Sequence, residues 1–414
     1  MPVKNIAFIV KYFPTVSETF IVNQINGLID AGFKVSLYAY QKVDTFIVHE
    51  SLKKYNLLSN VVYFVKPPVS KLSRLITFLN WTIQNLFKIK WRLFFKSLNV
   101  FKHGKDAYTL KLFFEAQWFL TSYDFEIIHA HFGMNGNRIA YLKAYGIIPE
   151  QVKLITTFHG YDLVPDKLNM YKEEYNYLFK EAAAFTVNTP YLEGLLQKVN
   201  NYQKPCDILP VGLDTTFFRR KTIKNNTEYF DIVFCGKLIT LKGPDLAIGI
   251  LNALHKLGYT QVRLHIIGNG KLRSELEKQV QSLNLKEYTV FYGSLSQKEI
   301  IQRFEQADVF ILPGRYDPET GRAETQGLVI QEAQSMGLPV VVSDVGGMKY
   351  GLLPDESGFI IKEGDINGFV STVEKFISNP KLKNQMGKVG RQHVKDQYDN
   401  GILAEKLLTI YKKI

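Results

Sequence analysis

Short runs rich in β-branched and aromatic residues alternate with helix-forming stretches along the chain, and this alternation limits the fold more than any other feature. Strands separated by helices pair in parallel, and the helices cross over the faces of the sheet. The first half contains six such runs: 6–10, 35–40, 61–65, 126–129, 154–158 and 185–188. The second half contains five: 230–235, 262–267, 290–292, 309–312 and 339–342. The sequence therefore predicts an α/β fold with two doubly wound, Rossmann-like sheets.

Length supports two domains, because 414 residues exceed what one hydrophobic core usually supports. The chain breakers Pro210 and Gly212 lie between the two sets of strands and predict a linker over residues 210–214. Ligands of doubly wound sheets bind at the carboxyl ends of the strands. We therefore expect one shared cleft where the two sheets face each other.

Composition indicates a soluble globular protein, with 46% hydrophobic and 22% charged residues. Cys206 and Cys235 are the only cysteines, and their spacing suggests neither a metal site nor a disulfide framework. The amino-terminal apolar run is too short for a signal peptide, and no run reaches the ~20 apolar residues of a membrane span. These features predict a cytoplasmic protein. The net charge of +12 predicts an acidic partner surface, either nucleic acid or anionic lipid.

The stretch 324–347, ETQGLVIQEAQSMGLPVVVSDVGG, carries the strongest chemical signal. A helix should begin near Gly327 and end before Gly337, and its free N–H groups and dipole would favour an anion. Glu332 would lie beside that ligand, where its carboxylate could accept two hydrogen bonds from a vicinal diol such as ribose. The alternative is an ordinary amphipathic helix that carries two surface glutamates, Glu324 and Glu332.

This stretch resembles the signature of the family-4 retaining glycosyltransferases: two glutamates with seven residues between them, a helix of small residues, Gly-x-Pro-Val-Val and a Gly-Gly turn. The resemblance runs from about residue 5 to residue 398 and is stronger in the second half. It implies the glycosyltransferase B fold, with an acceptor-side domain over 1–208, a donor-side domain over 209–391 and a last helix, 392–414, that packs back on the first domain. It also implies that Glu324 binds hydroxyls of the donor sugar. The N–H groups expected near sugar and phosphate belong to Gln326, Gly327, Leu328 and Val329.

Two lysines follow the strand 230–235. Lys237 and Lys242 precede Gly243 and Pro244, which open a helix, and two cations there suit a diphosphate leaving group. The resembled family has arginine where Lys237 stands. Lysine can offer the phosphate a point charge, but it cannot form the two parallel hydrogen bonds of a guanidinium group. The alternative is that both are ordinary surface lysines in a loop.

Two further segments belong to the expected nucleotide site. Gly268 and Gly270 follow the strand 262–267, and their spacing alone fits a simple tight turn. The resemblance places them beside the nucleotide, and it places Tyr292 in a segment that holds the base mostly through backbone groups.

Histidines mark the strand ends of the first half. His159 follows the strand 154–158, and the resemblance places it near the reacting sugar. Because strand side chains alternate between faces, we do not expect His129 and His131 to share a metal ion. We expect His131 on the acceptor side of the cleft. The string FPTVSETF resembles the same region of a subgroup that builds bacterial surface polysaccharides. We expect Glu18, which lies in this string, on the acceptor side of the cleft. The alternative is that Glu18 caps the first turn of a helix.

The expected activity is retaining transfer of a sugar from a nucleoside diphosphate sugar to a hydroxyl of a glycan or lipid-linked acceptor. His159, Glu324 and Lys242 are the expected catalytic residues. We expect no metal or other cofactor, since no Asp-x-Asp lies at a strand end. A nucleotide-dependent oxidoreductase is disfavoured because no G-x-G-x-x-G follows a strand. A nucleic-acid-binding protein would explain the charge, but no recognisable module carries it.

A basic and aromatic segment lies within the acceptor-side half. Residues 71–111 carry nine lysines and arginines against the single acid Asp106, a surplus of eight positive charges. Its cations are Lys71, Arg74, Lys88, Lys90, Arg92, Lys96, Lys102, Lys105 and Lys111, and its aromatic residues include Phe78, Trp81, Phe87, Trp91, Phe94, Phe95 and Phe101. Such a segment can lie in an anionic membrane interface, so we expect peripheral contact with the inner face of the cell membrane. The alternative is that the aromatic rings fill the domain core and the lysines form a solvated face.

Overall fold

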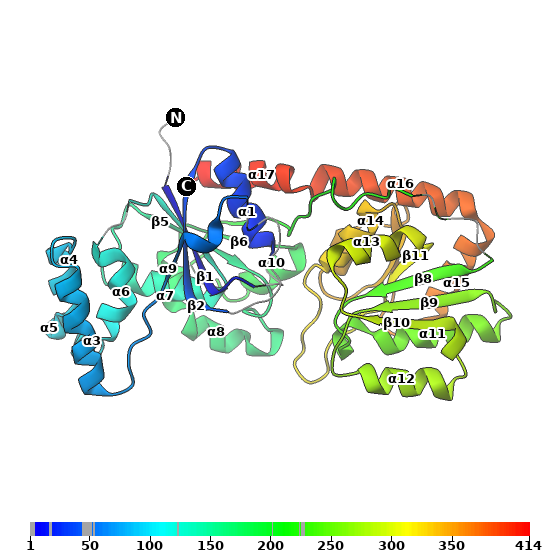
Figure 1. The fold of residues 1–414 in the computed structure, drawn as a ribbon, viewed down its shortest axis with the longest axis horizontal. Coiled ribbons are helices and arrows are strands. Elements are labelled where there is room, and N and C mark those ends of the chain that lie inside the picture. The colour runs from blue at the N-terminus through cyan, green and yellow to red at the C-terminus, as the bar shows by residue number, and fades with distance from the viewer. Residues whose placement is uncertain are drawn as a thin grey trace.

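Two parallel β-sheets form the frame of the molecule (Figure 1). The computed structural model describes residues 5–15, 19–43, 52, 54–121, 124–200, 202–222, 224 and 228–414. The first sheet has the strand order β3-β2-β1-β4-β5-β6-β7, and the second has the order β10-β9-β8-β11-β12-β13. The order reverses between β1 and β4 and again between β8 and β11, so each sheet has the switch point at which doubly wound folds bind ligands. The predicted pair of doubly wound sheets is confirmed.

The first sheet is flanked by helices that bury its apolar strands. Its strands are β1 (Asn5–Phe13), β2 (Lys34–Lys42), β3 (Val61–Tyr63), β4 (Ile127–His131), β5 (Lys153–Phe158), β6 (Ala184–Val187) and β7 (Cys206–Ile208). The helices around them are α1 (Thr19–Asp30), α6 (Lys111–Thr121), α7 (Gly133–Ala144), α8 (Leu168–Glu174), α9 (Asn176–Glu181) and α10 (Pro190–Gln197). All five residues of β4 are buried, as expected for a central parallel strand covered on both faces.

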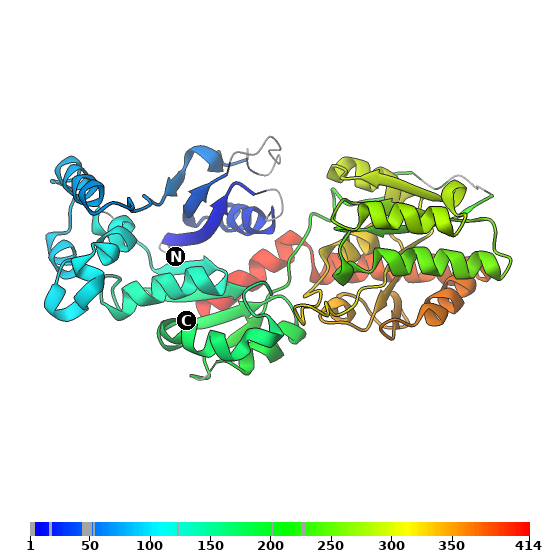
Figure 2. The same cartoon turned by 90° about the horizontal axis from the view of Figure 1, so that it is seen from below.

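The second sheet repeats this architecture. Its strands are β8 (Phe230–Cys235), β9 (Val262–Ile267), β10 (Thr289–Gly293), β11 (Val309–Leu312), β12 (Val340–Ser343) and β13 (Gly358–Ile361). Its helices are α11 (Pro244–Lys256), α12 (Arg273–Ser282), α13 (Gln297–Gln306), α14 (Leu328–Ser335), α15 (Ile366–Ser378) and α16 (Pro380–Gln397). Figure 2 shows the two sheets side by side along the long axis of the molecule.

Several element boundaries differ from the sequence prediction by one to three residues. The strand expected over 126–129 extends to His131. The edge strands β7 and β13 were not predicted, because runs of three or four residues are too short to give a periodic signal. Instead of one helix over 392–414, the chain forms α16 and α17 (Asn400–Lys412), separated at Tyr398 and Asp399.

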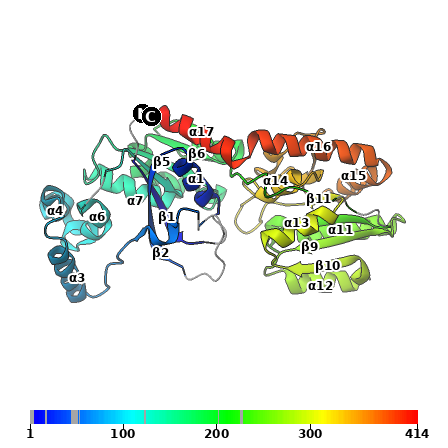
Figure 3. The ribbon, with the colours of Figure 1, turned by 45° about the horizontal axis from the view of Figure 1, so that its top comes forward.

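The chain passes twice between the two sheets, and the two passages are hydrogen-bonded to each other. Leu213 N donates to Tyr398 O over 3.0 Å, and Asn400 N donates to Leu213 O over 3.0 Å. A Cβ at Gly212 would lie 2.6 Å from a Leu403 methyl carbon, so this approach requires glycine. α17 then packs on the first domain, where Leu403, Leu407, Ile410 and Tyr411 share a core cluster with α1. Figures 1 and 3 show α16 and α17 running across both halves.

Three helices form the end of the first half that lies far from the second half in all three views (Figures 1–3). They are α3 (Lys71–Gln84), α4 (Trp91–Ser97) and α5 (Val100–Tyr108). Not one of the 14 residues of α3 is buried. α4 buries Phe94, which contacts Phe78 of α3 and Phe113 of α6 at ring-centroid distances of 5.7 and 5.9 Å.

Candidate functional site

A cleft of about 720 Å³ separates the carboxyl ends of the two sheets. The first half contributes Tyr12, His159 and Asn188, and the second half contributes Lys237, Glu324 and Gln326. These residues lie at the ends of strands or in the loops that follow them, where the fold leaves backbone groups and side chains open to a ligand. The structure thus brings residues from distant parts of the sequence into one cavity.

The amino-terminus of α14 lies at this cleft, with Gly327 as the N-cap residue in the left-handed region at φ 76°. Glu324 forms an ion pair with Lys242, and both side chains are largely buried. Burial opposes ionisation of Glu324, but Lys242 and the N–H groups of Gln326 and Gly327 outweigh it and hold the pKa of Glu324 below its ordinary value. The Glu324 carboxylate therefore lies at the positive end of the helix.

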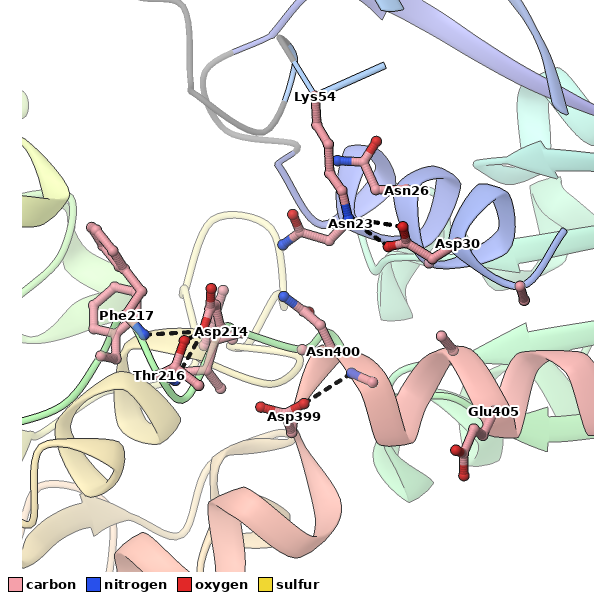
Figure 4. Close-up of a pocket in the computed structure, with 18 of the residues that line it drawn as sticks. Asn23, Asn26, Asp30, Lys54, Asp214, Thr216, Phe217, Asp399, Asn400 and Glu405 are labelled. Atoms are coloured by element: carbon pink, nitrogen blue, oxygen red, sulfur yellow. Dashed lines mark hydrogen bonds and ion pairs between the residues drawn. The ribbon is translucent and has the colours of Figure 1, made fainter. Parts of the chain in front are cut away.

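Glu332 lines a second cavity of about 730 Å³. The two cavities share Leu328, so the first turn of α14 lies between them. Figure 4 shows the second cavity between α1 and the start of α17, which contribute Asn23 and Asn400, and the segment that carries Asp214 and Phe217. Burial raises the pKa of Glu332 to about 7, although Lys242 opposes the shift. At neutral pH Glu324 is therefore ionised, whereas Glu332 is about half protonated.

Lys237 is exposed and lines the cleft, whereas Lys242 is held by Glu324. Both precede α11, whose N-cap is Gly243 at φ 67°. A Cβ at Gly243 would lie 1.9 Å from Pro313 O, so glycine is required there. The lysine loop after β8 is therefore fixed against the loop after β11.

Gly268 and Gly270 pack directly against the lysine loop. A Cβ at Gly268 would lie 1.9 Å from Gly236 O, and a Cβ at Gly270 would lie 2.5 Å from Leu238 O. The two glycines are therefore needed for the close approach of two loops. The side chain of Tyr292 is engaged elsewhere: its hydroxyl lies 2.9 Å from His265 Nδ1, and Arg303 covers its ring at 4.5 Å.

The expectation that His129 and His131 lie on opposite faces of their strand is wrong. They are two residues apart on β4, so they share one face, and their rings stack at a centroid distance of 4.7 Å. His131 is completely buried beneath His159, to which it is hydrogen-bonded over 3.0 Å, and it does not line the cleft. His159 alone of the three lines the cavity.

Glu18 lies outside the described residues. Among the residues that the structure does describe, no group of three histidine, cysteine, aspartate or glutamate side chains is placed to hold a metal ion. No helix in the described part of the chain is long and apolar enough to cross a membrane.

Sequence reasoning missed Asp162, which organises the first half of the cleft. Its carboxylate accepts hydrogen bonds from the backbone N–H groups of His159 at 3.0 Å, Gly160 at 2.9 Å and Gly133 at 2.8 Å. It thus ties the loop after β5 to the start of α7. The sequence signal for this role is the string His-Gly-x-Asp, residues 159–162, which directly follows β5.

Thr325 was also missed, although it lies within the signature between Glu324 and Gln326. Its hydroxyl donates to His159 O at 3.2 Å, and its carbonyl accepts a hydrogen bond from Thr189 Oγ1 at 2.7 Å. Gln326 forms two hydrogen bonds with the backbone of Val211 in the linker, at 2.7 and 2.8 Å. The signature therefore joins the two halves in addition to facing the cleft.

Two facing Rossmann-like sheets with a cleft between their strand ends define the glycosyltransferase B class. Sucrose-phosphate synthase from Thermosynechococcus elongatus has a TM-score of 0.69 and 18% identity over 99% of this chain and 98% of its own. Anabaena HepE, solved in complex with UDP, has a TM-score of 0.72 and 14% identity over 99% of this chain and all of its own.

Sequence comparisons give the family. A model described as Glycosyltransferase Family 4 matches residues 17–217, and one described as Glycosyl transferases group 1 matches residues 215–393. The putative colanic acid biosynthesis glycosyltransferase WcaL of Escherichia coli strain K12 is 27% identical over 99% of this chain and all of its own. The amylovoran biosynthesis glycosyltransferase AmsK of Erwinia amylovora is 24% identical with the same coverage. The chain belongs to the family-4 glycosyltransferases.

Proposed function

We propose that this glycosyltransferase moves a sugar from a nucleoside diphosphate sugar, with retention of anomeric configuration and without a metal ion, to a hydroxyl of a glycan or lipid-linked acceptor. The observation that carries the proposal is the Lys242–Glu324 pair at the amino-terminus of α14, in which Glu324 lines the cleft between the two sheets and Lys242 lies behind it. A cation, a carboxylate and a helix dipole at one point suit a donor with an anionic leaving group and a hydroxyl-rich sugar.

The donor would lie against the second half, which we take as residues 209–391. Glu332 would accept hydrogen bonds from the two ribose hydroxyls, and the backbone of the segment around Tyr292 would hold the base. The turn at Gly268 and Gly270 would lie beside the nucleotide, since it packs on the lysine loop. Solved Anabaena HepE contains UDP, which supports a nucleoside diphosphate in this fold.

The diphosphate would draw Lys242 away from Glu324 and toward its own charge, with Lys237 beside it. Glu324 would then be free to accept hydrogen bonds from the donor sugar, and the N–H groups of Gln326 to Val329 would face sugar and phosphate. Two lysines and a helix dipole supply the positive charge that a metal ion provides in other transferases.

Retention would follow from attack on the face that the phosphate leaves. The bond from the anomeric carbon to the phosphate oxygen breaks as the acceptor oxygen bonds to that carbon, and the departing phosphate oxygen takes the acceptor proton. Charge grows on the diphosphate during this step, so Lys242 would stabilise the transition state more than the bound donor. His159, at the cleft wall opposite Glu324, would hydrogen-bond the donor sugar.

The acceptor would enter along the first half, residues 1–208, on which α17 packs. The wall there is aromatic and includes Tyr12, Phe20, Phe132 and Tyr161. Aromatic rings offer flat apolar faces to sugar rings. The names of the colanic acid and amylovoran relatives support synthesis of a bacterial surface polysaccharide.

A donor screen tests this function. We expect one nucleoside diphosphate, from a set that includes UDP and GDP, to raise the melting temperature of the full chain, and the matching nucleotide sugar to be consumed with an acceptor extract in the presence of EDTA. Proton NMR of the purified product should give the same anomeric configuration as the donor. Dependence on an added divalent ion, or an inverted product, would overturn the corresponding part of the proposal.

We further propose that α3, α4 and α5 contact the inner face of an anionic membrane and so bring a lipid-linked acceptor to the cleft. The side chains of Phe87 and Phe101 are completely exposed, and those of Phe95 and Ile83 are mostly exposed. Phe78, Trp81 and Phe94, by contrast, pack into the domain core, so the aromatic residues of the segment divide between the two alternatives. Exposed Lys88, Arg92, Lys102 and Lys105 lie among these apolar side chains. Exposed rings together with cations suit a headgroup interface.

Charge reversal of Lys88, Lys90 and Arg92 to glutamate is expected to abolish sedimentation with phosphatidylglycerol vesicles at low salt, because each cation contributes about 1 kcal/mol near an anionic surface. Nucleotide binding should stay unchanged, since the donor site lies in the other half. A matched reversal of the exposed lysines Lys256, Lys278 and Lys286 in the second half should leave sedimentation intact. Wild-type protein that stays in the supernatant would remove the membrane surface and favour a soluble acceptor.

A further inference from the structure

Three histidine rings form a column beneath the wall of the cleft. His129 and His131 lie on β4, and His159 follows β5. Neighbouring rings stack at centroid distances of 4.7 Å between His129 and His131 and 5.3 Å between His131 and His159. His129 and His131 are completely buried, so the column leads from the domain interior to the one ring that lines the cavity.

The hydrogen bonds divide this column into two parts. His129 uses both ring nitrogens on other groups: Nδ1 lies 2.6 Å from Tyr411 Oη, and Nε2 lies 2.6 Å from Thr157 Oγ1. His131 Nδ1 lies 3.0 Å from His159 Nε2. The other nitrogen of His131, Nε2, is buried and has no hydrogen-bond partner among the described residues. His131 and His159 therefore form a pair whose protons are linked.

Burial lowers the pKa of His159 to about 3 and lowers the pKa of His131 well below its ordinary value. Both rings are therefore neutral at pH 7 and carry one proton each. A bond between two imidazole nitrogens needs one donor and one acceptor, so only two arrangements are possible. Either His131 donates from Nδ1 and His159 carries its proton on Nδ1, or His159 donates from Nε2 and His131 carries its proton on Nε2.

The second arrangement would leave the N–H of His131 Nε2 buried without an acceptor. The Phe8 ring is stacked on the His131 imidazole at an interplanar angle of 26°. The N–H group lies in the plane of the imidazole, so it does not point at the face of the Phe8 ring. Orphaned buried N–H groups are rare in folded proteins, and buried acceptors without a full set of partners are more common. The first arrangement leaves only a lone pair there and is favoured.

We propose that His131 is a positioning residue that holds His159 in the Nδ1–H tautomer, so that His159 offers a hydrogen-bond donor to the ligand in the cleft. A ring in this state can donate to a sugar hydroxyl oxygen or a phosphate oxygen, but it cannot take the proton of the acceptor hydroxyl at that nitrogen. The benefit to turnover rests on the proposed function of His159, whereas the tautomer itself does not.

Nitrogen-15 NMR of the full chain tests the tautomer without any substrate. In a long-range proton–nitrogen spectrum, the His159 signals are those lost in His159→Gln. Between about pH 6 and pH 8, where neutral imidazole persists if the pKa is low, we expect a protonated Nδ1 and an unprotonated Nε2 in wild type. A protonated Nε2, or an equal mixture of the two forms, would overturn the proposal.

Steady-state kinetics test the consequence. His131→Phe fills the space but cannot donate, and we expect it to lower kcat about tenfold or more with little change in the donor KM. His131→Asn places an amide near the position of Nδ1 and should restore most of that loss. His129→Phe is the matched control for a buried histidine replaced by phenylalanine, and it should keep the wild-type kcat.

Equal loss of kcat in the His131→Phe and His129→Phe variants, or no rescue by His131→Asn, would reduce His131 to a core residue and overturn its positioning role. If His131→Phe does not fold, the wild-type spectrum and the His131→Asn variant still decide. Normal turnover in His159→Gln would remove the role proposed for His159 while leaving the tautomer measurement valid, so the two failures are distinguishable.

Discussion

Replacing Lys242 by alanine is expected to lower kcat by about 10²- to 10³-fold, the loss that follows removal of one preorganised group that stabilises developing charge. Donor affinity should fall less, because the negative charge on the leaving diphosphate is greatest in the transition state. Lys242 is paired with Glu324 at the amino-terminus of α14, which is where the diphosphate is proposed to bind. Steady-state kinetics with a saturating acceptor give kcat and the donor KM separately.

The Glu324 carboxylate loses its partner in this variant, so stability needs its own control. Lys242→Arg keeps the charge and should retain more activity than Lys242→Ala. The double variant Lys242→Ala with Glu324→Gln removes the unpaired carboxylate, and its melting temperature separates a folding defect from a catalytic one. A raised donor KM with normal kcat in Lys242→Ala would mean that this lysine only binds substrate.

Glu332→Ala is expected to weaken donor binding at least tenfold, because each hydrogen bond to a charged group is worth roughly 1.5–3 kcal/mol and two ribose hydroxyls are involved. Calorimetry with an intact nucleotide sugar measures this change, and circular dichroism checks that the variant is folded. An unchanged dissociation constant would exclude Glu332 from the ribose site.

The pKa of Glu332 adds a pH signature to this prediction. Burial raises the pKa of the ligand-free carboxyl to about 7, so it is largely protonated at pH 6 and ionised at pH 8. Only the ionised form accepts hydrogen bonds from both hydroxyls. Donor affinity should therefore rise with pH through this range, by up to about tenfold per pH unit below the pKa. Glu332→Gln cannot ionise and should bind with little dependence on pH.

The local sequence pattern was sufficient to predict an element of secondary structure where the apolar run or the bounding residues lie within that element. Most strands of the second sheet were predicted to within about one residue, and β11 and β12 are the clearest cases because they are nearly continuous apolar runs, as expected for parallel strands buried on both faces. The helix α14 was found because Gly327 and Gly337 bound it. The edge strands β7 and β13 were missed because they are only three and four residues long and are mostly half-buried.

In the basic and aromatic segment, residues 71–111, the local sequence pattern does not predict which aromatic side chains are buried. The sequence gives the same kind of residue at Phe94 and Phe95, yet Phe94 is buried against Phe113 and Phe95 is exposed. Which ring faces inward depends on how α4 packs on α6, and this packing joins residues that are not neighbours in the chain. The histidine error has a different origin, because residues two apart on a strand share a face, and the alternation itself therefore places His129 and His131 on the same side of β4.

The sequence by itself determined the two-sheet fold and the strand ends and helix start at which the proposed donor site lies, because hydrophobic periodicity and glycine-bounded helix ends are properties of short segments. Only the tertiary structure decided how those residues are connected. Lys242 meets Glu324, Thr325 binds the backbone of His159, and His131 lies against His159 because separate strand ends converge on one cleft. These contacts join residues 28 to 166 positions apart, and no local pattern records which of them the folded chain brings together.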